Sequence, residues 1–406
     1  MDTKSQTTLE LPKILNRLAD QAHFSASKEL ARELTPTEDR DEAIQRLSAT
    51  TEARRLLAED PELSIGGARD VRPQTADAAR GLVLEPHDFL HIQDALIAGR
   101  TKRRFFEGRE EELPELSAIA AGLTVPAGMI DRISQVLDER GEVLDSASSE
   151  LKRIRNEHKV AYDRLMDKLQ SMVNDSKIAR MLQDPIVTQR EGRYVIPLRA
   201  EHKGKIKAVV HDQSSSGATL FVEPLKAVDL NNQVRELELA EREEIRRLLA
   251  ELSERVGEAR EEIDSTIAAL AGLDLAFAKA RYANILDAVE PELGPAPSRD
   301  GDGRVRTTLR LLGARHPLLH PEEVVPVDLV LDPDVRSLVI TGPNTGGKTV
   351  TLKTAGLLSL MALSGLHIPA EKGSELSTFQ QVFADIGDEQ SIEQSLSTFS
   401  AHVSNI

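Results

Sequence analysis

The sequence has 406 residues, enough for about two to four domains with sizeable cores, and its formal net charge is −16. It contains no cysteine, so disulfides, thiolate metal sites and cysteine nucleophiles are excluded. No apolar run approaches the ~18 residues of a membrane span, and the polar, acidic first residues are unlike a signal peptide. We therefore expect a cytoplasmic protein without a membrane partner.

Residues 1–143 predict a helical core with short connections. Apolar positions at helical spacing predict a helix over residues 9–34, and Thr37 or Asp39 can cap a second helix that runs to about residue 58. Further helices are expected over residues 86–106 and 114–123, and from residue 126 onward.

A long helical arm is predicted over residues 144–270. Residues 144–182 contain neither Gly nor Pro, and their apolar positions alternate in steps of three and four, which predicts one helix of ~38 residues and ~57 Å. The same spacing returns after Pro224 and continues to residue 270. Outgoing and returning helices of matched length favour an antiparallel arm over two unrelated helices folded into the body.

A small β-rich tip is predicted between the two helices, at residues 185–224. Four short β-type runs, at residues 186–189, 193–198, 207–211 and 218–222, are separated by turn residues. The chain then leads through residues 271–297, a return to the helical core, into a linker rich in Pro and Gly at 291–303.

The tip is locally basic although the whole chain is acidic. Residues 188–211 carry two acidic side chains and six basic ones, which are Arg190, Arg193, Arg199, Lys203, Lys205 and Lys207. Such a patch is either an ordinary solvated surface or a contact for a polyanion such as nucleic acid. An aromatic content of 3% makes base stacking a poor candidate for that contact.

Residues 298–406 carry the strongest motif. Leu338, Val339 and Ile340 predict a buried strand, a helix is expected over residues 350–363, and strands are also expected at 307–312 and 324–331. The loop between strand and helix matches G-x-x-x-x-G-K-[ST], with Gly342, Pro343, Asn344, Thr345, Gly346, Gly347, Lys348 and Thr349.

This loop predicts ATP or GTP binding. Its backbone N–H groups and the helix N-terminus would surround the phosphates, Lys348 would reach the β- and γ-phosphates, and Thr349 would bind Mg²⁺. The alternative is a Gly-rich turn that binds nothing. Because the motif is complete and lies between a strand and a helix, we expect a nucleotide site.

The arrangement resembles the MutS family, in particular its second bacterial branch. The resemblance is carried by residues 314–319 and 324–331, the GPN-x-GGK-[ST] form of the loop, and the later segments 383–387 and 396–399. It implies a mainly α protein with an ABC-type α/β P-loop ATPase portion. It also implies that Val324 and Val325 pack on adenine, that Asn344 lies near the γ-phosphate, and that Ser397 reaches the γ-phosphate of the other subunit in a homodimer.

One departure from the family pattern concerns the acidic Walker B residues. Residues 382–385 mimic a Walker B strand, but Ile386 and Gly387 follow where the catalytic Glu should be, so we interpret this segment as the strand before the family's Ser-Thr-Phe loop. The chain is therefore expected to be a piece that ends within the ATPase domain and to bind ATP but hydrolyse it poorly. The nuclease (Smr) domain typical of the branch is likewise expected to be missing.

The resemblance leaves the target open. One hypothesis is an ATP-dependent clamp on branched DNA (junctions and D-loops) that suppresses homologous recombination, in a branch whose longer members are also endonucleases. Another is a factor that grips rRNA in collided ribosomes and splits the subunits. A structural arm-ATPase of the chromosome-organising type is weaker, because those proteins place the P-loop before the arm and here it follows. The protein would accordingly be associated with the nucleoid or the ribosome.

Overall fold

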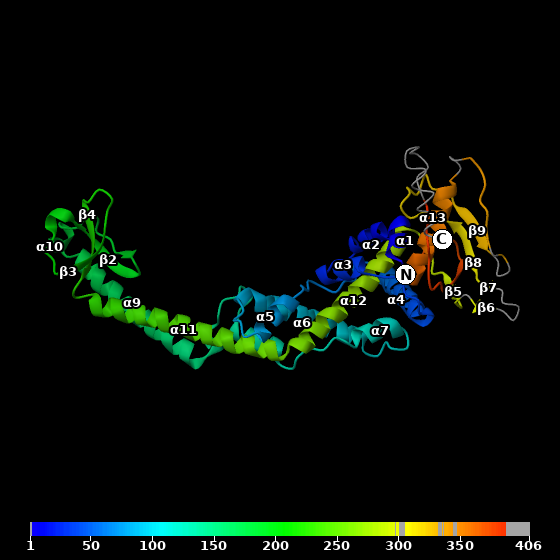
Figure 1. The fold of residues 1–406 in the computed structure, drawn as a ribbon. Helices are drawn as coiled ribbons and strands as arrows, with labels where there is room; N and C mark the ends of the chain where they lie inside the picture. Colours follow the sequence, from blue (N-terminus) through cyan, green and yellow to red (C-terminus); the bar gives the residue numbers. More distant parts are fainter. Residues whose placement is uncertain are drawn as a thin grey trace. The chain divides into compact units, whose positions relative to one another are not determined.

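The computed structural model describes residues 2–296, 298–299, 305–331, 335, 337–343 and 347–386. Contacts divide the chain into two compact units (Figure 1). Unit 1 comprises Met1–Pro73, Asp94–Pro126 and Glu261–Ile406, and unit 2 comprises Gln74–Gln93 and Ala127–Arg260. Among the described residues, no helix combines the length and the apolar character that a membrane crossing requires.

Helices form most of unit 1. They are α1 (Thr3–Thr8), α2 (Leu11–Ala19), α3 (Ser25–Arg32), α4 (Arg40–Glu59), the later part of α6 (Pro86–Phe106), α7 (Pro114–Ala120), α12 (Arg260–Ile285) and α13 (Lys348–Leu363). Asp39 caps α4, because its side chain accepts hydrogen bonds from the N–H groups of Asp41 and Glu42. The helices predicted at 39–58, 86–106 and 350–363 are thus confirmed.

The prediction of one helix over residues 9–34 is wrong, because the chain breaks between α2 and α3. At the break, Oδ2 of the fully buried Asp274 on α12 accepts hydrogen bonds from the N–H groups of His23 (2.9 Å) and Phe24 (3.0 Å). A buried carboxylate therefore supplies the cap that the local sequence lacks. The other oxygen of Asp274 pairs with Arg281 at 3.2 Å.

The sheet of unit 1 has the strand order β5-β10-β8-β9. The strands are β5 (Glu292–Gly294), β10 (Glu375–Ser377), β8 (Leu309–Ala314) and β9 (Val327–Leu331), and a separate ladder joins β6 (Ser298–Arg299) to β7 (Val305–Arg306). β5 and β10 pair in parallel, and the other neighbours are antiparallel. Buried residues of β8, β9 and β10 share one core with apolar side chains of α2, α4, α12 and α13.

Two predicted strands do not form. Residues 337–341 lie in no ladder of the described chain, and Leu338 and Val339 are 48% and 80% exposed. Residues 381–386 are not a strand either, and Phe383 is exposed. A strand buried on both faces needs paired neighbours and covering layers. No described strand supplies that pairing to either run.

Unit 2 is built on two long helices, α9 (Ser149–Val173) and α11 (Val228–Glu258), which pack antiparallel (Figure 1). It also contains α8 (Met129–Val136), the short helices α10 (Ser176–Ala179), η1 (Asp145–Ala147) and η2 (Ala200–His202), and parts of α5 (Arg72–Ala79) and α6. The prediction of one helix over residues 144–182 is too long. The helix ends at Val173, and Asp175 then caps α10.

The β-rich tip forms as predicted. Its sheet has the order β1-β2-β4-β3, all antiparallel, with strands β1 (Thr188–Arg190), β2 (Arg193–Arg199), β4 (Thr219–Pro224) and β3 (Ala208–Gln213). Apolar side chains of β2 and β4 are buried together with one face of α9 and the start of α11. The sheet and the helix pair therefore share one continuous core.

Candidate nucleotide-binding site and basic tip

The ends of the predicted phosphate-binding loop adopt conformations that favour glycine. Gly347 has φ +77° and stands directly before α13, while Gly342 has φ +149°. A Cβ added at either position would meet no atom within 4 Å, so backbone conformation rather than crowding requires glycine there. Pro343 is exposed, and Asn344, Thr345 and Gly346 lie outside the described residues.

Lys348 connects the two ends of this loop. Its Nζ donates a hydrogen bond to the carbonyl oxygen of Gly342 at 2.8 Å, although the lysine itself begins α13. The ammonium group therefore lies across the loop rather than along the helix. This is the position from which a lysine can bind the phosphates of a nucleotide held in the loop.

Helix α13 presents its N-terminus at the loop. The first N–H groups of a helix have no intrahelical acceptor and carry the positive end of the helix dipole, which favours an anion. Thr349 lies in this first turn and is exposed. The other end of the helix is fixed in the core, where Leu357, Leu360 and Met361 are almost fully buried. Lys348, Thr349 and the first N–H groups of α13 are the groups that could hold a triphosphate with its Mg²⁺.

A cavity of about 670 Å³ opens beside Thr349. Its lining combines Thr349, Val350 and Lys353 of α13 with the 316–319 turn and with residues around α2, notably Lys13 and Arg17. Arg17 donates to the carbonyl of Pro317 at 2.9 Å, and Lys353 lies 3.4 Å from Glu10. Glu10 also lines the cavity and pairs with Lys13 at 2.5 Å, so three cations face one carboxylate, and the excess of positive charge suits a phosphorylated ligand.

His316 belongs to this lining as a structural residue. It is buried, its Nδ1 accepts a hydrogen bond from the N–H of Leu318, and burial lowers its pKa.

The two residues expected beside adenine precede β9, where Val324 is half-buried and Val325 is 76% exposed. Ser397 lies outside the described residues. In the described part of the chain, no group of three or more His, Asp or Glu side chains could hold a metal by itself.

Among the six basic residues of the tip, the arginines have partners within the protein and the lysines are exposed. Arg190 pairs with Asp212 at 3.3 Å, and its guanidinium lies 4.2 Å from the centre of the Phe221 ring. Arg193 pairs with Glu223 at 3.2 Å, and Arg199 donates to the carbonyl of Leu182. The lysines occupy the connection from β2 to β3, and all three are exposed. Lys205 contacts His202, and the structure shows no carboxylate partner for Lys203 or Lys207 among the described residues.

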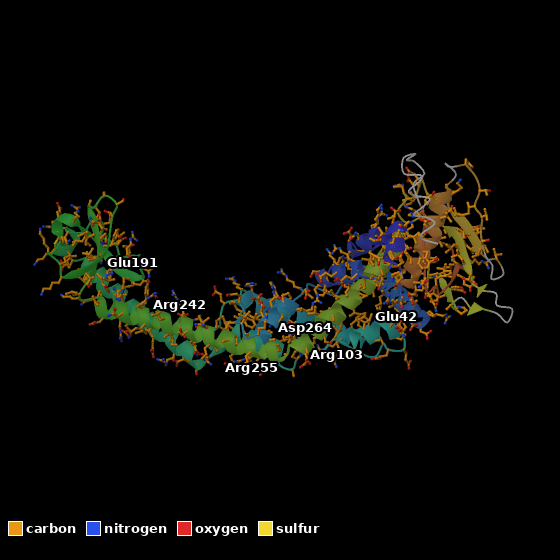
Figure 2. All side chains as sticks on the ribbon, in the orientation of Figure 1. Glu42, Arg103, Glu191, Arg242, Arg255 and Asp264 are labelled. Atoms are coloured by element: carbon orange, nitrogen blue, oxygen red, sulfur yellow. The ribbon has the colours of Figure 1, made fainter. Side chains whose placement is uncertain are left out.

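A buried carboxylate on β4 connects three strands of the tip sheet. Glu223 on β4 is 2% exposed, and its two oxygens accept from Arg193 on β2 (3.2 Å) and from His211 on β3 (2.6 Å). The β3–β4 register shifts between Val210 and Asp212, which places His211 in a bulge. Glu191, labelled in Figure 2, lies in the β1–β2 turn with φ +48°.

Comparisons with known proteins agree with this description. The profile of MutS domain V matches residues 338–406, which include the loop and α13. The Endonuclease MutS2 of Pelotomaculum thermopropionicum is 45% identical over all of this chain, and that of Thermomicrobium roseum is 47% identical over 98% of it. The Putative endonuclease MutS2 of Bacillus subtilis is 42% identical over all of the chain.

The chain belongs to the MutS family, as its sequence predicted. In each of the first two relatives the match covers 50% of the relative, so the chain spans about half the length of the curated relatives it matches.

Sequence reasoning missed part of the candidate site. The motif identified the loop, but Lys13 and Arg17 lie more than 300 residues before Lys348 and carry no motif of their own. Lys353 was detectable, since it lies one helical turn after Thr349 and shares its face. The two α2 cations could be found only from the tertiary structure.

Proposed function

We propose that this chain binds ATP with Mg²⁺ at residues 342–349 and grips nucleic acid through the lysines of the tip, as part of a MutS2-type clamp on branched DNA. The observation that carries the nucleotide part is the contact of Lys348 Nζ with the Gly342 carbonyl at the N-terminus of α13. Lys348 and the first-turn N–H groups would hold the phosphates, and Thr349 would hold the metal, which neutralises developing charge during hydrolysis.

The nucleic-acid part rests on the lysines of the β2–β3 connection. Lys203 and Lys207 are exposed and have no carboxylate partner in the described chain, so contact with a phosphate backbone would cost no internal ion pair. The arginines are already engaged by Asp212, Glu223 and Leu182. We therefore assign the contact to Lys203, Lys205 and Lys207, with Arg190, Arg193 and Arg199 shaping the surface behind them.

The proposal also covers dimerisation and the nuclease activity of a longer protein that would contain this chain. The relatives carry the name endonuclease, and a two-fold dimer in which Ser397 reaches the partner's nucleotide would couple ATP binding to closure of the clamp. Suppression of recombination would follow from stable binding to junctions.

Two variants separate the nucleotide site from the nucleic-acid site. Lys348→Ala should weaken ATP binding by at least about tenfold, because charge-assisted hydrogen bonds contribute roughly 1.5–3 kcal/mol, and should leave binding to a four-way DNA junction unchanged. The triple variant Lys203→Ala/Lys205→Ala/Lys207→Ala should do the opposite. It should weaken junction binding about tenfold at low salt and reduce the slope of log affinity against log salt concentration by about three.

Controls keep the result interpretable. Lys372→Ala, an exposed lysine of unit 1, should change neither affinity. Parallel loss of ATP and junction binding in both main variants would contradict two separate sites. Competition between junction DNA and stalled ribosomes tests the target, and preference for ribosomes would replace branched DNA in the proposal.

A further inference from the structure

A second cavity in unit 1, of about 540 Å³, contains a buried lysine and lies away from the loop residues. It is an open cavity bordered by α4, α7 and α12, and its lining is mostly apolar, including Ile119, Leu275 and Ala276. Lys279 of α12 also lines it and is only 6% exposed. Lysine is seldom buried without a compensating partner.

Among the described residues, the charge of Lys279 has no compensating partner. Its Nζ donates one hydrogen bond, to the carbonyl of Ser364 at 2.9 Å, and no carboxylate of the described residues lies within ion-pair distance. An ammonium group has three N–H donors, so two of them lack a protein acceptor in the described chain. Burial lowers the pKa of Lys279 to about 7, and the like charge of Arg46 adds to the shift.

Two of the polar groups around Lys279 have partners of their own, since Arg46 pairs with Glu42 and His367 contacts Thr51 and Arg54. On α4, Arg46 pairs with Glu42 at 2.6 Å; Glu42 is labelled in Figure 2. On α7, burial and the nearby Glu52 raise the pKa of Glu115. After α13, His367 is buried, and its pKa is lowered to about 4.

The backbone holds Lys279 in place. Gly365, with φ +74°, follows Ser364, and a Cβ added there would come within 2.3 Å of the Arg46 Cβ and 3.1 Å of Lys279 Nζ. Thr50 donates to the carbonyl of Gly365 at 2.8 Å. The chain after α13 is therefore packed tightly against the lysine, which leaves the cavity as the direction from which a further partner can reach its N–H groups.

We propose that this cavity binds a small amphipathic monoanion whose acidic head group pairs with Lys279 and whose apolar body lies against Ile119, Leu275 and Ala276. A carboxylate would accept the two N–H donors and compensate the buried charge. Apolar walls would cover the remainder of the ligand, as in ordinary small-molecule sites. A single anionic group is required, because Glu42 and Glu115 on the same lining would repel a second one.

Octanoate and neutral 1-octanol provide a matched pair of probes, since their chains are equal and only the charge differs. We expect saturable octanoate binding at one site per chain at pH 6.5, measured by isothermal titration calorimetry, and weaker binding of 1-octanol. Octanoate affinity should fall about tenfold between pH 6.5 and pH 8.5, because the lysine loses its proton in that range. Affinity for 1-octanol should not depend on pH.

Variants test the assignment to Lys279. Lys279→Met keeps the length of the side chain and should lower octanoate affinity at least tenfold while leaving 1-octanol binding intact. It should fold, because an apolar side chain replaces an uncompensated buried charge, and its unfolding midpoint at pH 6.5 should not fall. Ala118→Trp, at the exposed part of the lining, should block both probes.

Lys102→Met is the matched control, since Lys102 is a partly buried lysine of the same unit outside this cavity. It should leave octanoate binding unchanged. Equal octanoate affinity in Lys279→Met and the unsubstituted chain, or wild-type affinity independent of pH, would overturn the proposal. So would non-saturable octanoate binding.

Discussion

The tip of unit 2 and the segment before the nucleotide loop both contain β-branched apolar runs, yet only the tip forms strands from them. In the tip, Val222 on β4 is 1% exposed and is paired on both sides, with Ile196 and with Val210. Before the loop, Val339 is 80% exposed and lies in no ladder of the described chain.

The difference reflects how far apart in the sequence each strand and its pairing partners lie. The strands of the tip lie within residues 188–224 and are antiparallel, so short turns bring their partners together. A strand that leads into a phosphate-binding loop is typically central and parallel, and its neighbours arrive through crossovers. Apolar β-branched sequence is therefore sufficient for a strand only where pairing partners are close in the chain.

The largest expected effect concerns the buried carboxylate of the tip. Glu223→Ala should lower the free energy of unfolding of unit 2 by about 3 kcal/mol, because Arg193 and His211 lose the acceptor that joins their strands. Urea denaturation followed by circular dichroism measures the loss. The control Asp212→Ala breaks the exposed pair with Arg190 and a local hydrogen bond from the Gln213 N–H, and should cost about 0.5–1 kcal/mol. Equal costs for the two variants would show that Glu223 does not organise the sheet.

A matched pair of valine substitutions tests the comparison directly. Val222→Ala removes buried methyl groups from a paired strand and should cost about 2 kcal/mol. Val339→Ala removes the same groups from an exposed, unpaired segment and should change stability by less than about 0.5 kcal/mol. Denaturant titrations of both variants give these values. A cost near 2 kcal/mol for Val339→Ala would mean that residues 337–341 are a buried strand after all.

A further expected effect, seen with pH rather than denaturant, is a difference in acid sensitivity between the units. In unit 1, burial lowers the pKa of His367 to about 4, with Arg54 adding to the shift, so folding favours the neutral ring. The contribution of the neutral His367 ring to the free energy of unfolding is fully present above pH 6.5 and is lost as pH falls from 6.5 towards 4. His367 lies in a chain of hydrogen bonds, with Nδ1 3.0 Å from Arg54 and Nε2 3.0 Å from the Thr51 hydroxyl.

In unit 2, hydrogen bonds from Arg247 and then from Ser148 lower the pKa of Glu244 to about 2. The contribution of the ionised Glu244 carboxylate to the free energy of unfolding is fully present above pH 4.5 and is lost as pH falls from 4.5 towards 2. Hydrogen exchange, corrected for intrinsic rates, should therefore show α4 loosening at a higher pH than α9 and α11. His367→Asn should remove only the pH-dependent increase in hydrogen exchange of unit 1, and Glu244→Gln should remove only that of unit 2. An increase at the same pH in both units would contradict this assignment.

Much of the local structure was predictable from residue patterns. The four strands of the tip fall within about two residues of their predicted runs, and α4, α6 and α13 begin and end close to the expected positions. The nucleotide loop was found because its glycines, Lys348 and Thr349 are contiguous. These features depend on neighbours a few residues apart, which a sequence pattern records directly.

Several other features were not predictable. The break between α2 and α3 is capped by Asp274, about 250 residues later in the chain. The cations Lys13 and Arg17 reach the cavity beside Thr349 only because α2 packs near α13. The parallel pairing of β5 with β10 joins residues more than 80 positions apart. No local pattern encodes such contacts.

The sequence by itself determined where helices and hairpin strands occur, where the phosphate-binding loop lies, and that positive charge gathers in the tip. Periodicity, turn residues and a contiguous motif act over a few residues, so they are legible in the chain. Only the tertiary structure decided which basic side chains of the tip have acidic partners, which apolar run is left unpaired, and that Lys279 is buried beside a cavity without a counter-charge. Those outcomes depend on which distant groups share a low-dielectric interior, and burial sets their energies only after the chain has packed.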